Sequence, residues 1–118
     1  MRYRWRIFLA NLDPVIGSEQ GRVRPILVIS EEQINQILPV VNVLPLTTLK
    51  PGRVVYPNEA LIPFAQSGLP NDSIVLCYQI RTLDKKRLIK DLGAINDLQI
   101  RATILEALRF QLAVDDKG

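Results

Sequence analysis

Short apolar and β-branched runs, separated by turn-forming residues, recur along most of the chain. Such runs, bounded by Gly, Pro, Asn or Asp, are typical of a small antiparallel β-barrel or sandwich. The pattern therefore predicts a mainly β fold. The predicted strands cover residues 7–12, 23–30, 40–47, 53–56, 73–81 and 88–95.

The connections between these runs carry their own signals. Pro51-Gly52 predicts a hairpin turn, and residues 68–72 predict a second loop. Residues 31–37 predict a short helical turn after the second strand. Residues 57–64 contain two prolines, which restrict this segment to an edge strand or to coil.

The C-terminal part changes to a helical period. Asn96 is a predicted N-cap, with Gln99 three residues later as in a capping box. Residues 115–118 are expected to fray. The apolar residues that recur at helical spacing, and that we expect to pack on the sheet, are Leu98, Ala102, Leu105, Leu108 and Leu112.

Length and composition place the chain among ordinary globular proteins. We expect one domain over residues 1–118, because 118 residues with 47% hydrophobic and 23% charged content can bury a core without disulfides or structural metals. The single cysteine, Cys77, excludes an internal disulfide and lies in an apolar run that predicts a buried thiol. No run approaches the ~20 apolar residues of a membrane span. We therefore expect a cytoplasmic protein without a membrane association.

The charge balance is mildly basic. Fifteen basic against twelve acidic residues give a net charge of +3, which is compatible with a nucleic-acid partner without proving one. Arg2, Arg4 and Arg6 alternate, so on an extended chain they share one face, opposite Tyr3 and Trp5. A solvated surface explains any one basic group equally well.

Histidine is absent from the chain. This excludes an imidazole base and most zinc sites. No cysteine or carboxylate cluster suggests another metal, and no phosphate-binding glycine motif is present. Any catalysis must therefore use Arg, Lys, Glu, Asp, Ser, Thr or Tyr, and we expect no cofactor.

The connection between the first two predicted strands is unusually long. Hairpin loops have about two to five residues, whereas this one runs from about residue 13 to residue 22. It contains a hydroxyl, a carboxylate and an amide in the run Gly17–Gln20, and Arg24-Pro25 follows it. Rigid strands that hold a polar loop are a common arrangement for functional residues.

These segments together resemble the MazF/PemK family of toxin endoribonucleases. The resemblance rests on LDPVIGSEQGRVRPILVIS, then VNVLPLTT, then DSIVLCYQIRTLDKKRL, in order and over nearly the whole chain. It implies an SH3-like barrel with a C-terminal helix, a homodimer, and metal-independent cleavage of single-stranded RNA at a short sequence. It also implies inhibition by a cognate, MazE-like antitoxin.

The resemblance carries over residue by residue. The family's catalytic arginine corresponds to Arg24 and its catalytic threonine to Thr47. Many relatives begin the first strand with Gly-Asp, where this chain has Trp5-Arg6. The residues predicted to contact RNA lie in the first loop, after Thr47 and in the QIRT segment: Gly17, Ser18, Gln20, Arg22, Thr48, Gln79 and Arg81.

The implied chemistry agrees with what these side chains can do. RNA supplies its own nucleophile, the 2′-hydroxyl, so an enzyme need only align it and stabilise charge on the phosphate. The planar guanidinium of Arg24 matches two phosphate oxygens, and Thr47 can donate to them from a stiff rotamer. Glu19 is the better base by proton affinity. The expected products carry a 2′,3′-cyclic phosphate and a 5′-hydroxyl.

Several assignments have alternatives. Ser18 and Gln20 can equally serve to stabilise their loop, and Thr48 can be structural. Gln79 and Arg81 alternate, so both can face the groove or pair across a dimer. For the whole protein, the alternatives are a gyrase-poisoning toxin on the same fold and a catalytically inactive module that binds an antitoxin. The antitoxin is expected to be an acidic, partly disordered chain that folds on the basic surface and blocks the groove.

Overall fold

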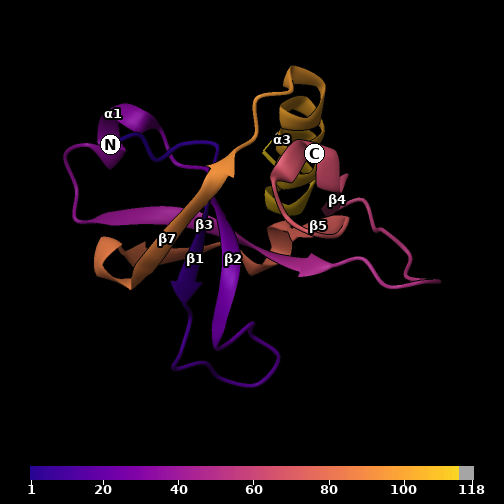
Figure 1. The fold of residues 1–118 in the computed structure, drawn as a ribbon, viewed down its shortest axis with the longest axis horizontal. Coiled ribbons are helices and arrows are strands. Elements are labelled where there is room, and N and C mark those ends of the chain that lie inside the picture. The colour runs from indigo at the N-terminus through magenta and orange to yellow at the C-terminus, as the bar shows by residue number, and fades with distance from the viewer. Residues whose placement is uncertain (115–118) are drawn as a thin grey trace.

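The computed structural model describes residues 1–114 (Figure 1). The predicted fraying of residues 115–118 lies outside this range. The strands are β1 (Arg6–Asn11), β2 (Val23–Val28), β3 (Val40–Thr48), β4 (Glu59–Ile62), β5 (Ser73–Leu76), β6 (Arg81–Asp84) and β7 (Leu88–Ala94). The helices are α1 (Glu32–Asn35), α2 (Phe64–Ser67) and α3 (Leu98–Leu112), with 3₁₀ turns at Cys77–Gln79 and Lys85–Arg87.

The strands of the described chain form one antiparallel, seven-stranded sheet. Its order is β4-β5-β3-β2-β1-β7, and β6 also pairs with β3. The sheet bends strongly on itself, and α3 packs beside β4 and the 3₁₀ turn Cys77–Gln79 (Figure 1). The predicted mainly β fold with an appended C-terminal helix is therefore confirmed, although the strand path stays open between β4 and β7.

The sheet buries apolar side chains on both of its faces. Ile7 and Leu27 belong to a core shared with α3, whereas their neighbours Phe8 and Ile26 belong to a second core inside the bend. Because side chains alternate along a strand, two buried faces require nearly continuous apolar runs. This is why β1 and β2 have that pattern in the sequence.

The strand predicted over residues 73–81 is interrupted. β5 pairs with the end of β3, from Leu46 to Thr48, and β6 pairs with its start, from Val40 to Val43. The residues left over between these two registers form the 3₁₀ turn Cys77–Gln79. Cys77 is buried as predicted. Burial, with a smaller contribution from Glu59, raises the pKa of its thiol to about 12, so the thiol is inert.

The segment after β3 also differs from the prediction. Residues 53–56 are not a strand, because Arg53 and the Tyr56 N–H both bind the Glu59 carboxylate, at 2.7 Å and 3.0 Å. Pro51-Gly52 does form a turn, but not a hairpin, since β3 pairs with β5 and not with β4. Residues 57–64 contain the edge strand β4.

Two details of the C-terminal helix differ from the predicted ones. Asp97, not Asn96, is the N-cap, and its carboxylate accepts the Ile100 N–H at 3.0 Å. The buried face is centred on Ile104 and Ala107, with Leu105 and Leu108 partly buried, whereas Leu98, Ala102 and Leu112 are exposed. None of the helices within residues 1–114 has the length and apolarity to cross a membrane.

The N-terminal residues 2–6 are not continuously extended, because a turn lies at Arg4 and Trp5. Trp5 adopts a left-handed backbone with φ of 67°, and the Arg6 N–H donates to the Tyr3 carbonyl. The Trp5 side chain is 7% exposed and has the guanidinium carbons of Arg4 and Arg101 at 5.4 Å and 5.1 Å from its ring centroid. The alternation of arginines and aromatics therefore does not sort them onto two faces.

Candidate active site

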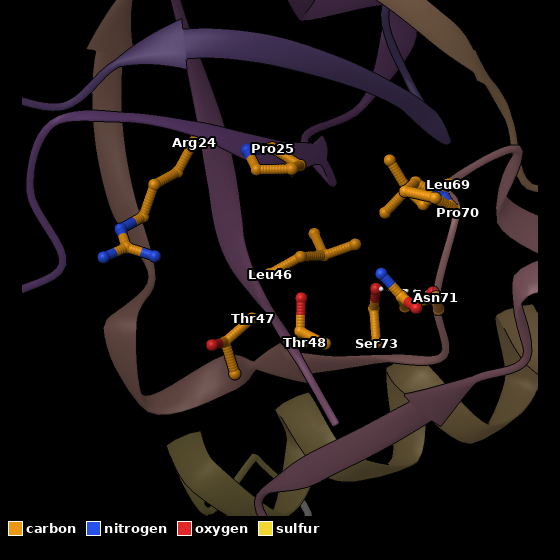
Figure 2. A pocket seen from close by; sticks show the side chains of 9 residues that line it. All are labelled: Arg24, Pro25, Leu46, Thr47, Thr48, Leu69, Pro70, Asn71 and Ser73. Atoms are coloured by element: carbon orange, nitrogen blue, oxygen red, sulfur yellow. Dashed lines mark hydrogen bonds between the residues drawn. The ribbon is translucent and has the colours of Figure 1, made fainter. Parts of the chain in front are cut away.

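A cavity of about 160 Å³ opens where β2, β3 and the start of β5 meet the loop before β5. Side chains from segments far apart in the sequence point into it (Figure 2). Its lining consists of Arg24, Pro25, Leu46, Thr47, Thr48, Leu69, Pro70, Asn71 and Ser73. Two predicted catalytic residues, Arg24 and Thr47, and one predicted RNA-contacting residue, Thr48, are thus brought together.

Arg24 lies near the start of β2, opposite Ala10 of β1, and is partly buried. Its Nε donates to the Gly21 carbonyl at 3.0 Å, which fixes the plane of the guanidinium. Its two terminal nitrogens have no hydrogen-bond partner within residues 1–114. These donors therefore remain available for a ligand, in the fork geometry that suits phosphate.

Thr47 lies near the end of β3, where it pairs with Ile74 of β5. Its hydroxyl points toward the Arg24 guanidinium (Figure 2). The strand pairing fixes the backbone, and a β-branched side chain has few rotamers. A cation and a hydroxyl donor therefore converge from two rigid strands, and such a pair binds and polarises an anion such as a phosphodiester.

Glu19 and Ser18 do not line this cavity. They border a separate surface depression with Tyr78, Gln79 and Arg81, among others. The Glu19 carboxylate accepts the Ile16 N–H at 2.6 Å, which closes a local turn of the loop. The structure thus places the predicted base in a depression that shares no lining residue with the cavity.

The side chain of Gln79 binds main-chain atoms of the loop between β1 and β2. Its side-chain oxygen accepts the Gln20 N–H at 3.4 Å, and its side-chain nitrogen donates to the Ser18 carbonyl at 3.1 Å. Both contacts involve main-chain atoms, so the side chains of Ser18, Glu19 and Gln20 are not needed for them. Gln79 therefore has a structural contact in the folded protomer.

Two arginines hold the base of the same loop. Arg81 donates to the Leu12 carbonyl at 3.2 Å, and Arg87 donates to the carbonyls of Asn11 and Asp13. The sequence motif QIRTLDKKRL thus anchors the loop that precedes Arg24. The anchoring by Arg87 is a contact that sequence reasoning missed, although the residue lies within that motif.

The loop backbone also depends on particular residues. Gly17 and Arg22 have positive φ, at 57° and 64°. The Arg22 N–H donates to the Asp13 carboxylate at 2.8 Å. A Cβ on Gly21 would lie 2.8 Å from the same carboxylate, so a larger residue there would displace it. The carbonyl that orients Arg24 therefore belongs to a position where a side chain would force its neighbours to shift.

The electrostatics of the site follow from this arrangement. Arg24 is the one charged side chain among the cavity's nine lining residues, so its positive charge has no carboxylate partner in the cavity. Within residues 1–114, no group of three or more His, Cys, Asp or Glu side chains is arranged to hold a metal ion. The arrangement favours an anionic ligand.

Comparison with known proteins places this geometry in context. The family model described as "PemK-like, MazF-like toxin of type II toxin-antitoxin system" matches residues 3–112. The chain is 36% identical over 113 residues to Endoribonuclease EndoA of Bacillus subtilis, covering 96% of both proteins. It is 38% identical over 107 residues to Endoribonuclease MazF of Staphylococcus saprophyticus, covering 86% of this chain and 83% of the relative.

A solved structure agrees with these matches. The crystal structure of MazE-MazF from Deinococcus radiodurans contains a chain that superposes with a TM-score of 0.71 at 27% identity. The match covers 94% of this chain and 95% of that one. Nearly the whole chain is therefore similar to these proteins in sequence and in fold.

Proposed function

The chain belongs to the PemK-like, MazF-like toxin family of type II toxin-antitoxin systems, and we propose that it cleaves single-stranded RNA at the cavity formed by Arg24 and Thr47. The endoribonuclease names of two relatives support the activity. The observation that carries the proposal is the convergence of Arg24 and Thr47, from two different strands, on one cavity. The cleavage is proposed to be sequence-specific and independent of metal.

The proposed reaction is a transesterification within the RNA. The 2′-hydroxyl loses its proton to a base as its oxygen attacks the adjacent phosphorus, and the bond to the 5′-oxygen breaks. The departing 5′-oxygen takes a proton from water, so the products carry a 2′,3′-cyclic phosphate and a 5′-hydroxyl. Negative charge increases on the non-bridging oxygens during the attack. The terminal nitrogens of Arg24 and the hydroxyl of Thr47 are proposed to donate to these oxygens, and such prearranged donors are worth most in the transition state.

The reaction also needs a base for the 2′-hydroxyl proton. A guanidinium holds its proton too tightly to act as a base, so Glu19 is the proposed base because of its proton affinity. Since Glu19 borders a separate depression, this role requires the loop to move when RNA binds. The residues proposed to contact RNA are Gly17, Ser18, Gln20, Arg22, Thr48, Gln79 and Arg81.

The proposed assembly is an isologous homodimer. Ligand pockets for small molecules have about 300–1,000 Å³, and a cavity of about 160 Å³ is too small for several nucleotides. A second protomer would extend the binding surface. The proposed protein partner is an acidic, MazE-like antitoxin, which the family description and the similar MazE-MazF structure support.

The test is cleavage of a defined RNA by purified protein in the presence of excess chelator. Wild-type protein should cut, and Arg24→Ala should reduce the rate by at least about 10²–10³-fold, the usual cost of removing one charge-stabilising donor. Thr47→Val should also be slower. A substrate with a 2′-deoxy sugar at the cleaved position should stay intact, because it lacks the nucleophile.

Matched controls separate chemistry from general damage. Arg109→Ala and Thr103→Val change the same residue types on the exposed face of α3, and both variants should cut at the wild-type rate. Intact RNA with wild-type protein would contradict the proposal, and arrested supercoiling in a parallel gyrase assay would then favour a gyrase poison. Cleavage that stops with chelator would contradict the metal-independent mechanism.

A further inference from the structure

The cavity that contains Arg24 and Thr47 has a second end with different chemistry. Figure 2 shows Asn71 and Ser73 at the end away from the Arg24 guanidinium, with Leu69 and Pro70 beside them. No other charged side chain lines the cavity. A phosphate held by Arg24 would therefore have an uncharged compartment next to it, with apolar walls and amide and hydroxyl groups.

The side-chain amide of Asn71 is available for hydrogen bonding at this end of the cavity. Within residues 1–114, its side-chain amide makes no hydrogen bond, although its backbone carbonyl accepts from the Ser73 hydroxyl at 3.3 Å. The amide nitrogen points into the cavity (Figure 2). An amide offers a donor and an acceptor side by side, so it can pair with a ligand edge that presents both in the same spacing.

The segment that carries Asn71 is held firmly. The Asp72 carboxylate accepts the Phe64 N–H at 2.9 Å, and the Asp72 carbonyl accepts the Leu49 N–H at 2.9 Å. The Ser67 hydroxyl accepts the Leu69 N–H at 3.0 Å. These contacts fix the backbone on both sides of Asn71, while its side chain is exposed to solvent. A base that covers the amide would displace its water, so a mismatched base would leave the amide unpaired.

We propose that this end of the cavity is a nucleobase subsite next to the scissile phosphate, with Asn71 as the specificity-determining residue that reads an adenine. This rests on the proposed endoribonuclease function. The flat base would lie between the apolar side chains of Leu69 and Pro70 and the floor at Leu46. The Asn71 amide would accept from adenine N6 and donate to N7, the usual pairing of an amide with adenine.

The lining also argues against the other usual pairings. Guanine is most often read by Arg or Lys, and cytosine by Asp or Glu. The Asn71 end has none of these side chains. The hydroxyls of Thr48 and Ser73 donate or accept equally well, so they add contacts without setting the choice of base. Adenine is the base that the amide fits best.

The experiment begins by mapping cleavage ends of wild-type protein on a long transcript. Short RNAs are then made with each of the four bases at the positions flanking the cut. At one flanking position, wild-type protein should prefer adenine by about 10–100-fold in kcat/KM, the discrimination of one bidentate pair. Replacing that adenine with 7-deazaadenine, which lacks N7, should lose a large part of this preference.

Asn71→Leu should abolish the preference and make the variant indifferent to the 7-deaza substitution. Asn71→Asp, which is isosteric and replaces the donor by an acceptor, should also lose discrimination, and it carries the test if Asn71→Leu does not fold. Gln66→Leu changes an exposed amide on α2 that does not line the cavity. This control should keep the wild-type pattern.

The outcomes separate the two proposals. If wild-type protein cuts no RNA, the proposed function fails. If it cuts and Asn71→Leu keeps the wild-type base preference, the subsite is refuted while the nuclease stands. If Asn71→Leu slows the cutting of all four substrates equally, Asn71 is structural and the inference is overturned as well.

Discussion

Trp5 offers a direct test of how backbone strain and burial oppose each other in this fold. Its left-handed backbone, with φ of 67°, is a conformation that favours glycine. Its indole is nonetheless buried to 7% exposure between two guanidinium groups. We predict that Trp5→Gly and Trp5→Ala both destabilise the protein, and that alanine is the worse of the two.

The magnitudes follow from the two opposing effects. Removing a buried tryptophan side chain costs about 3–5 kcal/mol of unfolding free energy, lost cation–π contacts included. The left-handed backbone costs a non-glycine residue about 1–2 kcal/mol, which Trp5→Gly recovers and Trp5→Ala does not. Glycine also stabilises the unfolded chain by roughly 0.5–1 kcal/mol. We expect losses of about 4 kcal/mol for alanine and about 3 kcal/mol for glycine.

The assay is urea unfolding at fixed protein concentration, because association would shift the midpoint. Trp5 is the only tryptophan, so unfolding is followed by far-UV circular dichroism rather than by its fluorescence. Trp5→Ala at least as stable as Trp5→Gly would show that no strain is stored at this position. Wild-type stability in Trp5→Gly would show that the indole contributes no more than the backbone strain that glycine relieves.

Three further results are expected. Burial raises the pKa of Glu32, but hydrogen bonds, first from the Arg4 N–H, lower it from 4.5 to about 2. Its stabilisation is therefore present above about pH 4.5 and lost as the pH falls toward 2, and Glu32→Gln should flatten this acid limb in thermal melts. Gln79→Leu should speed hydrogen exchange in residues 16–21 about fivefold or more, whereas Gln66→Leu should not. Sedimentation should show a dimer at micromolar concentration, and a monomer would contradict the proposed assembly.

The strands could be predicted where burial fixes the pattern. β1, β2 and β3 are apolar on both faces, and the predicted strands overlap these elements closely. The break between β5 and β6 could not be predicted. It arises because these two strands pair with β3 in different registers, and the sequence of one segment does not show how it pairs with another. The coil at Arg53 has another origin, a local ion pair with Glu59 six residues along the chain, and residue types alone do not show that these two side chains meet.

The candidate site was predictable to the extent that it rests on residue types. Arg24 and Thr47 follow from the motif resemblance, and the structure places both on one cavity. The position of Glu19 depends on a short turn closed by its own carboxylate, which the sequence does not specify. A role for Asn71 in the site could not be predicted, because an asparagine before a strand is an ordinary turn residue.

The anchoring of the loop between β1 and β2 has a consequence for how this protein can change over generations. Gln79, Arg81 and Arg87 grip main-chain atoms of the loop and its base. Replacing most side chains at the tip of the loop leaves these hydrogen bonds in place, provided that the glycines are kept. Substitutions at the tip can thus change what it touches while the scaffold stays the same.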